Sequence, residues 1–270
     1  MAPIKCLTIS MPNLFKKIIF ACIFSLLSYS TSGCSVVKQN TYVTPTRGFV
    51  QVFSETNITE CVPKSPCKIG PVRSVGSGGV IEHRNGLTLI LTAAHVCDAD
   101  FNANSRKTIA KYTTKLFVRI WTGEFAPAKI LSSSKDSDLD LCTIYIRTPK
   151  APLSKINLSP RAPVPGDRVT AMAAPAGIYH PPTVPILQGV YSGRIPDKKI
   201  SMVTIPAQPG ASGALILNEE NGIVGVIIAV SLQFDHITLA VNYPETRKFV
   251  TNSRKIFRRN TLKVPVLVVE

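Results

Sequence analysis

Short runs of β-branched and apolar residues, each closed by turn residues, follow one another along this chain from residue 47 to residue 241. Short runs with turn signals between them are typical of an all-β sandwich or barrel. No long amphipathic helix interrupts them, and the one helical pattern, at residues 244–257, follows the last run. The expected strands are residues 47–54, 78–83, 87–94, 115–121, 141–146, 168–174, 222–230 and 236–241. The sequence therefore predicts an all-β protein with one C-terminal helix.

A proline-rich stretch at residues 151–165 separates the expected strands into two groups. Such a composition is typical of a linker between subdomains. The chain has 270 residues, of which 45% are hydrophobic and 17% charged, which is enough apolar material for a core and argues against disorder. We therefore expect one compact unit at residues 47–150 and a second at residues 166–257, with a basic tail at residues 258–270.

The N-terminal segment has the pattern of an export signal. Lys16 and Lys17 precede an apolar run at residues 18–27, and small polar residues then lead to Cys34. This order is typical of a secretory signal peptide, and the run is short for a membrane span. Residues 1–33 are therefore predicted to be a signal peptide and residues 34–46 a linker. The residues before Cys34 also resemble a bacterial lipobox, which makes Cys34 a candidate lipidation site; an uncleaved anchor is the alternative.

The chain is strongly basic, with a formal net charge of +15. A surplus of this size favours anionic surroundings such as phospholipid headgroups or cell-envelope polymers, although a basic solvated surface gives the same composition. The basic runs lack interleaved aromatic residues, so specific nucleic-acid binding is not expected.

Five of the seven cysteines lie from Cys34 onward. Cys61 and Cys67 are six residues apart in a proline-containing loop, where an oxidising compartment would allow a small disulfide. No second cysteine pair accompanies them, so we expect no metal site. Cys142 lies inside an apolar run and is predicted to be a buried thiol.

Three residues with nucleophilic, basic and acidic side chains follow one another in a recognisable order. His95 comes directly after an expected strand, Asp138 and Asp140 precede another, and Ser212 lies in the glycine-rich stretch "AQPGASGALI". Each alone is weak evidence, because such residues are more often structural. The order His, Asp, Ser is that of chymotrypsin-like enzymes and differs from the orders in subtilisin and the α/β-hydrolases.

The chemistry of acyl transfer explains why these residue types are needed together. A serine hydroxyl becomes a nucleophile when an imidazole takes its proton, and a carboxylate orients that imidazole. Backbone N–H groups of Gly210 and Ser212 are candidate donors of an oxyanion hole. The same pattern implies neither a metal nor a cofactor.

The chain resembles the trypsin-like serine proteases of the chymotrypsin fold, nearest to the bacterial HtrA-like branch. The resemblance rests on "GSGGVI" (76–81), "LTLILTAAHV" (87–96), "DLCTI" (140–144), "PGASGALILNEENGIVGVIIAV" (209–230) and "LAVNYPETRKFV" (239–250). It implies two six-stranded antiparallel β-barrels with the catalytic residues between them. It also selects Asp140 over Asp138 as the acid, and strand alternation agrees, because Asp140 would share an apolar face with Cys142.

The resemblance also locates a primary specificity pocket at Pro206, Ala207, Ile227, Ile228 and Ala229. Proline stands at position 206, where trypsin-type enzymes have an acid, so an apolar lining for small or medium apolar side chains is expected. Ala211 replaces the aspartate that receives a freed N-terminus in trypsin-type zymogens. No PDZ-like domain is expected after residue 257.

These observations predict an exported serine endopeptidase that acts on a protein or peptide through His95, Asp140 and Ser212. The alternative is a catalytically inactive protease fold that serves as a binding scaffold on the cell envelope. A basic surface-binding protein is a third, weaker reading.

Overall fold

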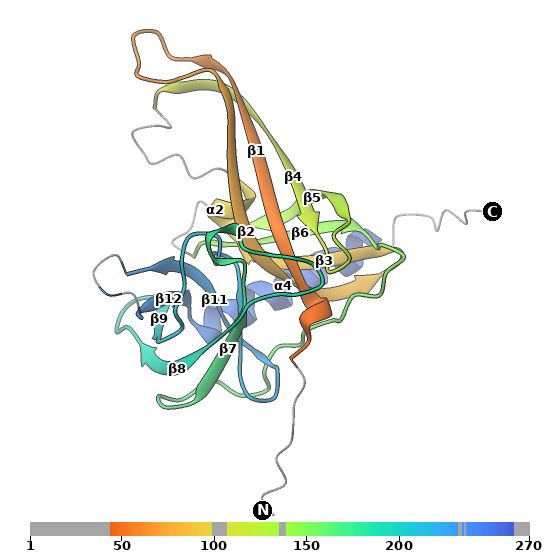
Figure 1. The fold of residues 1–270 in the computed structure, drawn as a ribbon, viewed down its shortest axis with the longest axis vertical. Coiled ribbons are helices and arrows are strands. Elements are labelled where there is room, and N and C mark those ends of the chain that lie inside the picture. The colour runs from red at the N-terminus through yellow and green to blue at the C-terminus, as the bar shows by residue number, and fades with distance from the viewer. Residues whose placement is uncertain (1–43, 99–106, 135–138, 232–233, 235, 262–270) are drawn as a thin grey trace, which may run out of the picture. The chain divides into compact units, whose positions relative to one another are not determined.

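Two closed six-stranded antiparallel barrels and a C-terminal helix make up the fold (Figure 1). The computed structural model describes residues 44–98, 107–134, 139–231, 234 and 236–261. The predicted fold class is confirmed. The signal peptide, Cys34, most of the 34–46 linker, Asp138 and residues 262–270 of the basic tail lie outside the described residues.

The first barrel has the strand order β1-β2-β3-β6-β5-β4. Its interior is filled by apolar side chains of alternating strand positions, such as Val50 and Val52 of β1 and Ile144 and Ile146 of β6, all 0–1% exposed. The strands are β1 (Phe49–Cys61), β2 (Gly70–Arg84), β3 (Leu87–Ala93), β4 (Ile109–Arg119), β5 (Phe125–Ser133) and β6 (Leu141–Arg147).

The second barrel has the order β10-β11-β12-β9-β8-β7. Its core is built from small and β-branched residues, among them Val169, Ala171 and Ile216. The strands are β7 (Arg168–Met172), β8 (Ile186–Arg194), β9 (Ile200–Val203), β10 (Leu215–Leu217), β11 (Ile223–Val230) and β12 (Thr238–Val241).

Three strands of the first barrel continue into an arm. β1 pairs with β2 as far as Ile58↔Gly70 and with β4 as far as Cys61↔Ile109, whereas β5 pairs with β4 only from Leu116 onward. Figure 1 shows β1, β2 and β4 running together beyond the other strands. The Cys61–Cys67 disulfide closes the loop at the end of this arm.

The helix α4 (Tyr243–Thr261) follows β12 and is longer than the predicted 244–257. Residues 258–261 therefore belong to a helix rather than to a basic tail. Val250 and Phe257 are buried in a cluster that includes apolar residues of both barrels. Glu82 of β2 reinforces this docking, because its buried carboxylate lies 2.6 Å from Arg258 Nε and 3.6 Å from Arg254 Nε.

The proline-rich segment 151–165 does more than connect the barrels. The Ile156 N–H donates to Val80 O of the first barrel at 2.8 Å, and the Ile223 N–H of the second barrel donates to Asn157 O at 2.8 Å. Ile156 is also 1% exposed. The segment therefore packs as part of the core between the barrels. Among the described residues, no helix has the length and hydropathy needed to cross a membrane.

Candidate active site

His95 and Asp140 are brought together by the pairing of β3 with β6. His95 lies in the one-turn helix α2 (Ala94–Cys97) directly after β3, and Asp140 directly precedes β6. Because Ala93 pairs with Leu141, the two side chains meet at the same end of the barrel. His95 Nδ1 lies 2.7 Å from Asp140 Oδ2, and the His95 N–H donates to Asp140 Oδ1 at 2.9 Å. The carboxylate thus fixes both the ring and the backbone of His95.

Asp140 lies just outside β6, so the strand alternation that agreed with its selection does not apply to it. It has a φ of +46°, a left-handed conformation that is uncommon for residues other than glycine. Its carbonyl oxygen accepts the Ala94 N–H at 3.2 Å, which holds the turn against α2. The side chain is 30% exposed, so the expected apolar burial with Cys142 does not describe it. Such conformations persist where the surrounding contacts determine them.

The Ser212 turn is fixed to the first barrel by Ser77 of β2. The Ser77 N–H donates to Ser212 O at 2.8 Å, and the Ser77 hydroxyl donates to Gly210 O at 2.7 Å. The Ser77 oxygen in turn accepts the Ala174 N–H at 2.9 Å. Ser77 is fully buried, and sequence reasoning assigned it no role although it lies in the quoted "GSGGVI". Its hydroxyl ties together two loops of the second barrel.

Ser212 and α2 approach each other at Gly76. A methyl group on Gly76 would lie 2.6 Å from both γ carbons of Val96 and 3.0 Å from Ser212 O. The residue after His95 and the serine backbone therefore contact the same point of β2. Within the described part of the chain, the Ser212 hydroxyl makes no hydrogen bond to His95. Catalytic hydrogen bonds are often long in unbound enzymes and shorten in the substrate complex.

The backbone around Ser212 leaves two N–H donors without acceptors. Within the described residues, neither the Gly210 nor the Ser212 N–H donates a hydrogen bond, whereas the neighbouring Ala211 N–H donates to Gln208 O at 2.9 Å. Gly210 has a φ of +97°, and a side chain there would meet the backbone of Ala176 and Gly177. Two free donors at a glycine turn are suited to binding an oxyanion.

The family model of the trypsin-like peptidase domain matches residues 76–226, a span that includes His95, Asp140 and Ser212. The chain belongs to the trypsin-like peptidase family. None of the curated proteins compared matches this chain. The predicted resemblance to trypsin-like serine proteases is confirmed.

A solved structure of this fold is the serine endoprotease from Yersinia pestis, with a TM-score of 0.56 and 20% sequence identity. The match covers 80% of this chain and 64% of that protein, so this chain spans less than two thirds of that protein's length. At this identity the likeness concerns the fold.

The five residues expected to shape the specificity pocket of the peptidase divide into two groups. Ala207 and Ile227 are 5% and 1% exposed, and their side chains belong to the core of the second barrel. Pro206, Ile228 and Ala229 reach the surface at least in part. The Ile227 carbonyl oxygen accepts the Gly213 N–H at 2.7 Å, and the Ile227 N–H donates to Ala214 O at 2.9 Å. These two hydrogen bonds hold β11 beside the Ser212 turn.

Cys142 is buried as predicted, but it is not a thiol. It forms a disulfide with Cys97, and neither cysteine is exposed. The prediction was wrong because Cys97 is the last residue of α2 and Cys142 lies on β6, a proximity that only the β3–β6 pairing reveals. Among the described residues, no three His, Cys, Asp or Glu side chains are grouped as a metal site requires.

A buried tyrosine supports the loop that contacts Gly210. Tyr179 is 3% exposed and packs edge-on against Phe49 at 5.0 Å between ring centroids. Burial raises the pKa of Tyr179 to about 12, although the nearby Arg119 guanidinium acts in the opposite direction. Gln51 of β1 donates to Gly177 O at 3.0 Å in the same loop. Phe49 and Gln51 of the first barrel thus hold the loop of the second barrel that packs against Gly210.

Proposed function

We propose that this chain is an exported serine endopeptidase in which His95 is the general base, Asp140 its orienting carboxylate and Ser212 the nucleophile. The observation that carries the proposal is the double contact between His95 and Asp140, at 2.7 Å from the ring and 2.9 Å from the backbone. A carboxylate that accepts the Nδ1–H leaves Nε2 with its lone pair free to take a proton.

The proposed reaction begins when His95 Nε2 takes the proton of the Ser212 hydroxyl. The serine oxygen forms a bond to the substrate carbonyl carbon, and the carbonyl electron pair becomes an oxyanion between the Gly210 and Ser212 N–H groups. The C–N bond then breaks, and the leaving amine takes the proton from His95. Water hydrolyses the acyl-enzyme by the same steps and regenerates Ser212.

We infer a preference for small or medium apolar side chains before the scissile bond. The candidate pocket residues Pro206, Ile228 and Ala229 carry no charge, so none of them can pair with a Lys or Arg side chain of the substrate. Each buried methylene of the substrate contributes about 0.8 kcal/mol, so discrimination among apolar residues is expected to be modest. Profiling with a peptide library tests this, and dominant cleavage after Arg, Lys, Glu or Gln contradicts it.

Export and attachment to an anionic envelope surface belong to the same proposal. Their support is the N-terminal pattern that ends at Cys34 and the net charge of +15. Mass spectrometry of the mature protein tests export, because no peptide from residues 1–33 is expected. A Cys34→Ser variant that stays bound to membranes contradicts lipidation as the anchor.

A fluorophosphonate probe, which reacts with an activated serine hydroxyl, tests the central proposal. The wild type is expected to become covalently labelled at Ser212, and Ser212→Ala is expected to remain unlabelled while folded. Ser231→Ala, a serine further along the same barrel, is the control and is expected to label normally. An unlabelled, folded wild type that hydrolyses no peptide identifies the chain as a binding scaffold instead.

A further inference from the structure

A disulfide joins the two elements that carry His95 and Asp140. Cys97 lies two residues after His95 at the end of α2, and Cys142 lies two residues after Asp140 on β6. The two hydrogen bonds between His95 and Asp140 close one end of this pair of segments, and the disulfide closes the other. Both cysteines are 0% exposed, which makes the bond an internal link rather than a surface thiol pair.

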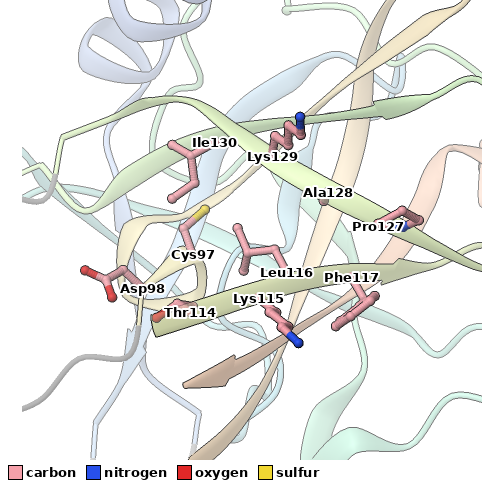
Figure 2. Close-up of a pocket in the computed structure, with 10 residues that line it drawn as sticks. All are labelled: Cys97, Asp98, Thr114, Lys115, Leu116, Phe117, Pro127, Ala128, Lys129 and Ile130. Carbon is pink, nitrogen blue, oxygen red and sulfur yellow. The ribbon is translucent and has the colours of Figure 1, made fainter. Parts of the chain in front are cut away.

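The helix α2 is short, and a cavity lies on one side of it. It has four residues, and a single turn of helix is not stable without tertiary contacts. A cavity of about 480 Å³ lies where α2 faces β4 and β5, and Cys97, Asp98, Leu116 and Ile130 are among its lining residues. Figure 2 shows Cys97 between Leu116 and Ile130 at the edge of this cavity. Ala94 and Val96 pack into the core of the first barrel, whereas Cys97 and Asp98 face this cavity, so the disulfide is a covalent restraint on the side of α2 that borders it.

We propose that Cys97 and Cys142 are positioning residues for the reaction: their disulfide holds α2 against β6 so that His95 stays bonded to Asp140 throughout the proton transfers. The inference rests on the proposed function, because the catalytic roles of His95 and Asp140 come from that proposal. Displacement of a catalytic group by about 1 Å can cost about 10²-fold in rate. Because the disulfide lies next to His95 and Asp140, it limits the displacement of one relative to the other.

The second disulfide of the chain supplies a matched control. Cys61 and Cys67 are six residues apart and close the loop at the end of the arm, whereas α2, which carries His95, lies near the base of the arm (Figure 1). Removal of this bond also deletes two sulfur atoms and one covalent link. It leaves the segments that carry His95 and Asp140 unchanged.

The experiment compares Cys97→Ala/Cys142→Ala and Cys97→Val/Cys142→Ala with Cys61→Ala/Cys67→Ala. The kinetics of each protein are measured at a temperature below the midpoint of its own thermal unfolding. For the first two variants, kcat is expected to fall by about 10- to 100-fold with KM changed less than about twofold. The low-field proton resonance of the His95 Nδ1–H is expected to weaken or disappear. The control is expected to keep kcat, KM and the resonance.

Folded Cys97/Cys142 variants that retain wild-type kcat and the Nδ1–H resonance overturn the proposal. If both variants fail to fold where the control folds, the disulfide serves folding, and the specific positioning role is also rejected. The resonance does not require turnover, so it reports on the tether even if the wild type proves inactive. Failure of the proposed function is instead read from the unlabelled wild type.

Discussion

His95 receives two restraints from one carboxylate, since both its ring and its backbone N–H bond to Asp140. We expect His95→Ala and Ser212→Ala each to lower kcat for peptide hydrolysis by about 10⁶-fold, and Asp140→Ala by about 10⁴-fold. The smaller effect expected for Asp140 follows from its proposed role, which is to orient and stabilise His95 rather than to exchange the proton. Steady-state kinetics with a fluorogenic peptide gives these ratios.

Asp138→Asn is the matched control for the acid. Asp138 is two residues before Asp140 and has the same side chain. Because the carboxylate that contacts the ring and the backbone of His95 is that of Asp140, Asp138→Asn is expected to leave kcat nearly unchanged. Loss of activity in Asp138→Asn together with an active Asp140→Asn would move the acid to position 138.

Deprotonation of Tyr179 is expected to make the free energy of unfolding depend on pH in the alkaline range. Burial raises its pKa from 10.0 to about 12, so the folded protein holds the phenol proton more tightly than the unfolded chain. The resulting stabilisation is fully present below pH 10.0 and is lost as the pH rises towards about 12. Urea unfolding across this range is expected to show a smaller decline for Tyr179→Phe than for the wild type. Equal declines in both proteins would contradict this.

At the scale of the elements, Gly76 is where β2, α2 and the Ser212 turn meet. Gly76→Ala is expected to lower kcat by about 10²-fold, because its methyl group would lie 2.6 Å from both Val96 γ carbons. Val96→Ala removes those carbons, so Gly76→Ala/Val96→Ala is expected to recover part of the loss. Kinetics of the two single variants and the double variant form the cycle that measures this coupling. Full additivity in the double variant would contradict the proposed contact.

The docking of α4 depends on one buried carboxylate. Glu82 has 7% of its side chain exposed, and Arg254 beside it has 16%. Burial lowers the pKa of Arg254, and the Glu82 carboxylate opposes that shift. Glu82→Gln is therefore expected to lower the free energy of unfolding by about 3 kcal/mol, the cost of leaving a buried cation unpaired. Chemical unfolding monitored by circular dichroism measures the change.

Glu55→Gln controls for the chemistry of that substitution. The Glu55 carboxylate pairs with Arg73 at 2.9 Å, but 77% of the Arg73 side chain is exposed. Exposed pairs contribute about 0–1 kcal/mol, so little change is expected. Similar losses in both variants would show that burial does not determine the effect.

The elements also show what the sequence can and cannot predict. Eight strands were found from their β-branched runs, but β5 contains Pro127, β8 contains two glycines and β10 has only three residues, so their local patterns are weak. β1 and β2 extend beyond their predicted ends because the polar arm is stabilised by pairing rather than by core burial. The order and local settings of His95, the two aspartates and Ser212 predicted the site, and the resemblance then selected Asp140 over Asp138. Ser77 and the Cys97–Cys142 pair emerge only from strand register.

For the whole molecule, the presence of Ala211 predicts that activity does not require cleavage of the N-terminus. Ala211 is 0% exposed inside the second barrel, and its methyl group cannot pair with a freed α-amine. Protein purified with an N-terminal tag is expected to have the same kcat as protein from which the tag has been cleaved. Strict dependence of turnover on cleavage would contradict this, and active-site titration with the fluorophosphonate probe normalises both samples.

The hydroxyl of Ser77 has a mechanical consequence for the peptidase. It sits in one barrel, yet it holds Gly210 and Ala174 of the other, so the shape of the turn around Ser212 depends on the seam between the two halves. Any molecule that wedged this seam open would distort the serine turn while leaving His95 and Asp140 bonded within the first barrel. Such a molecule would inhibit the proposed hydrolysis without occupying the proposed substrate site, and His95 would remain bonded to Asp140.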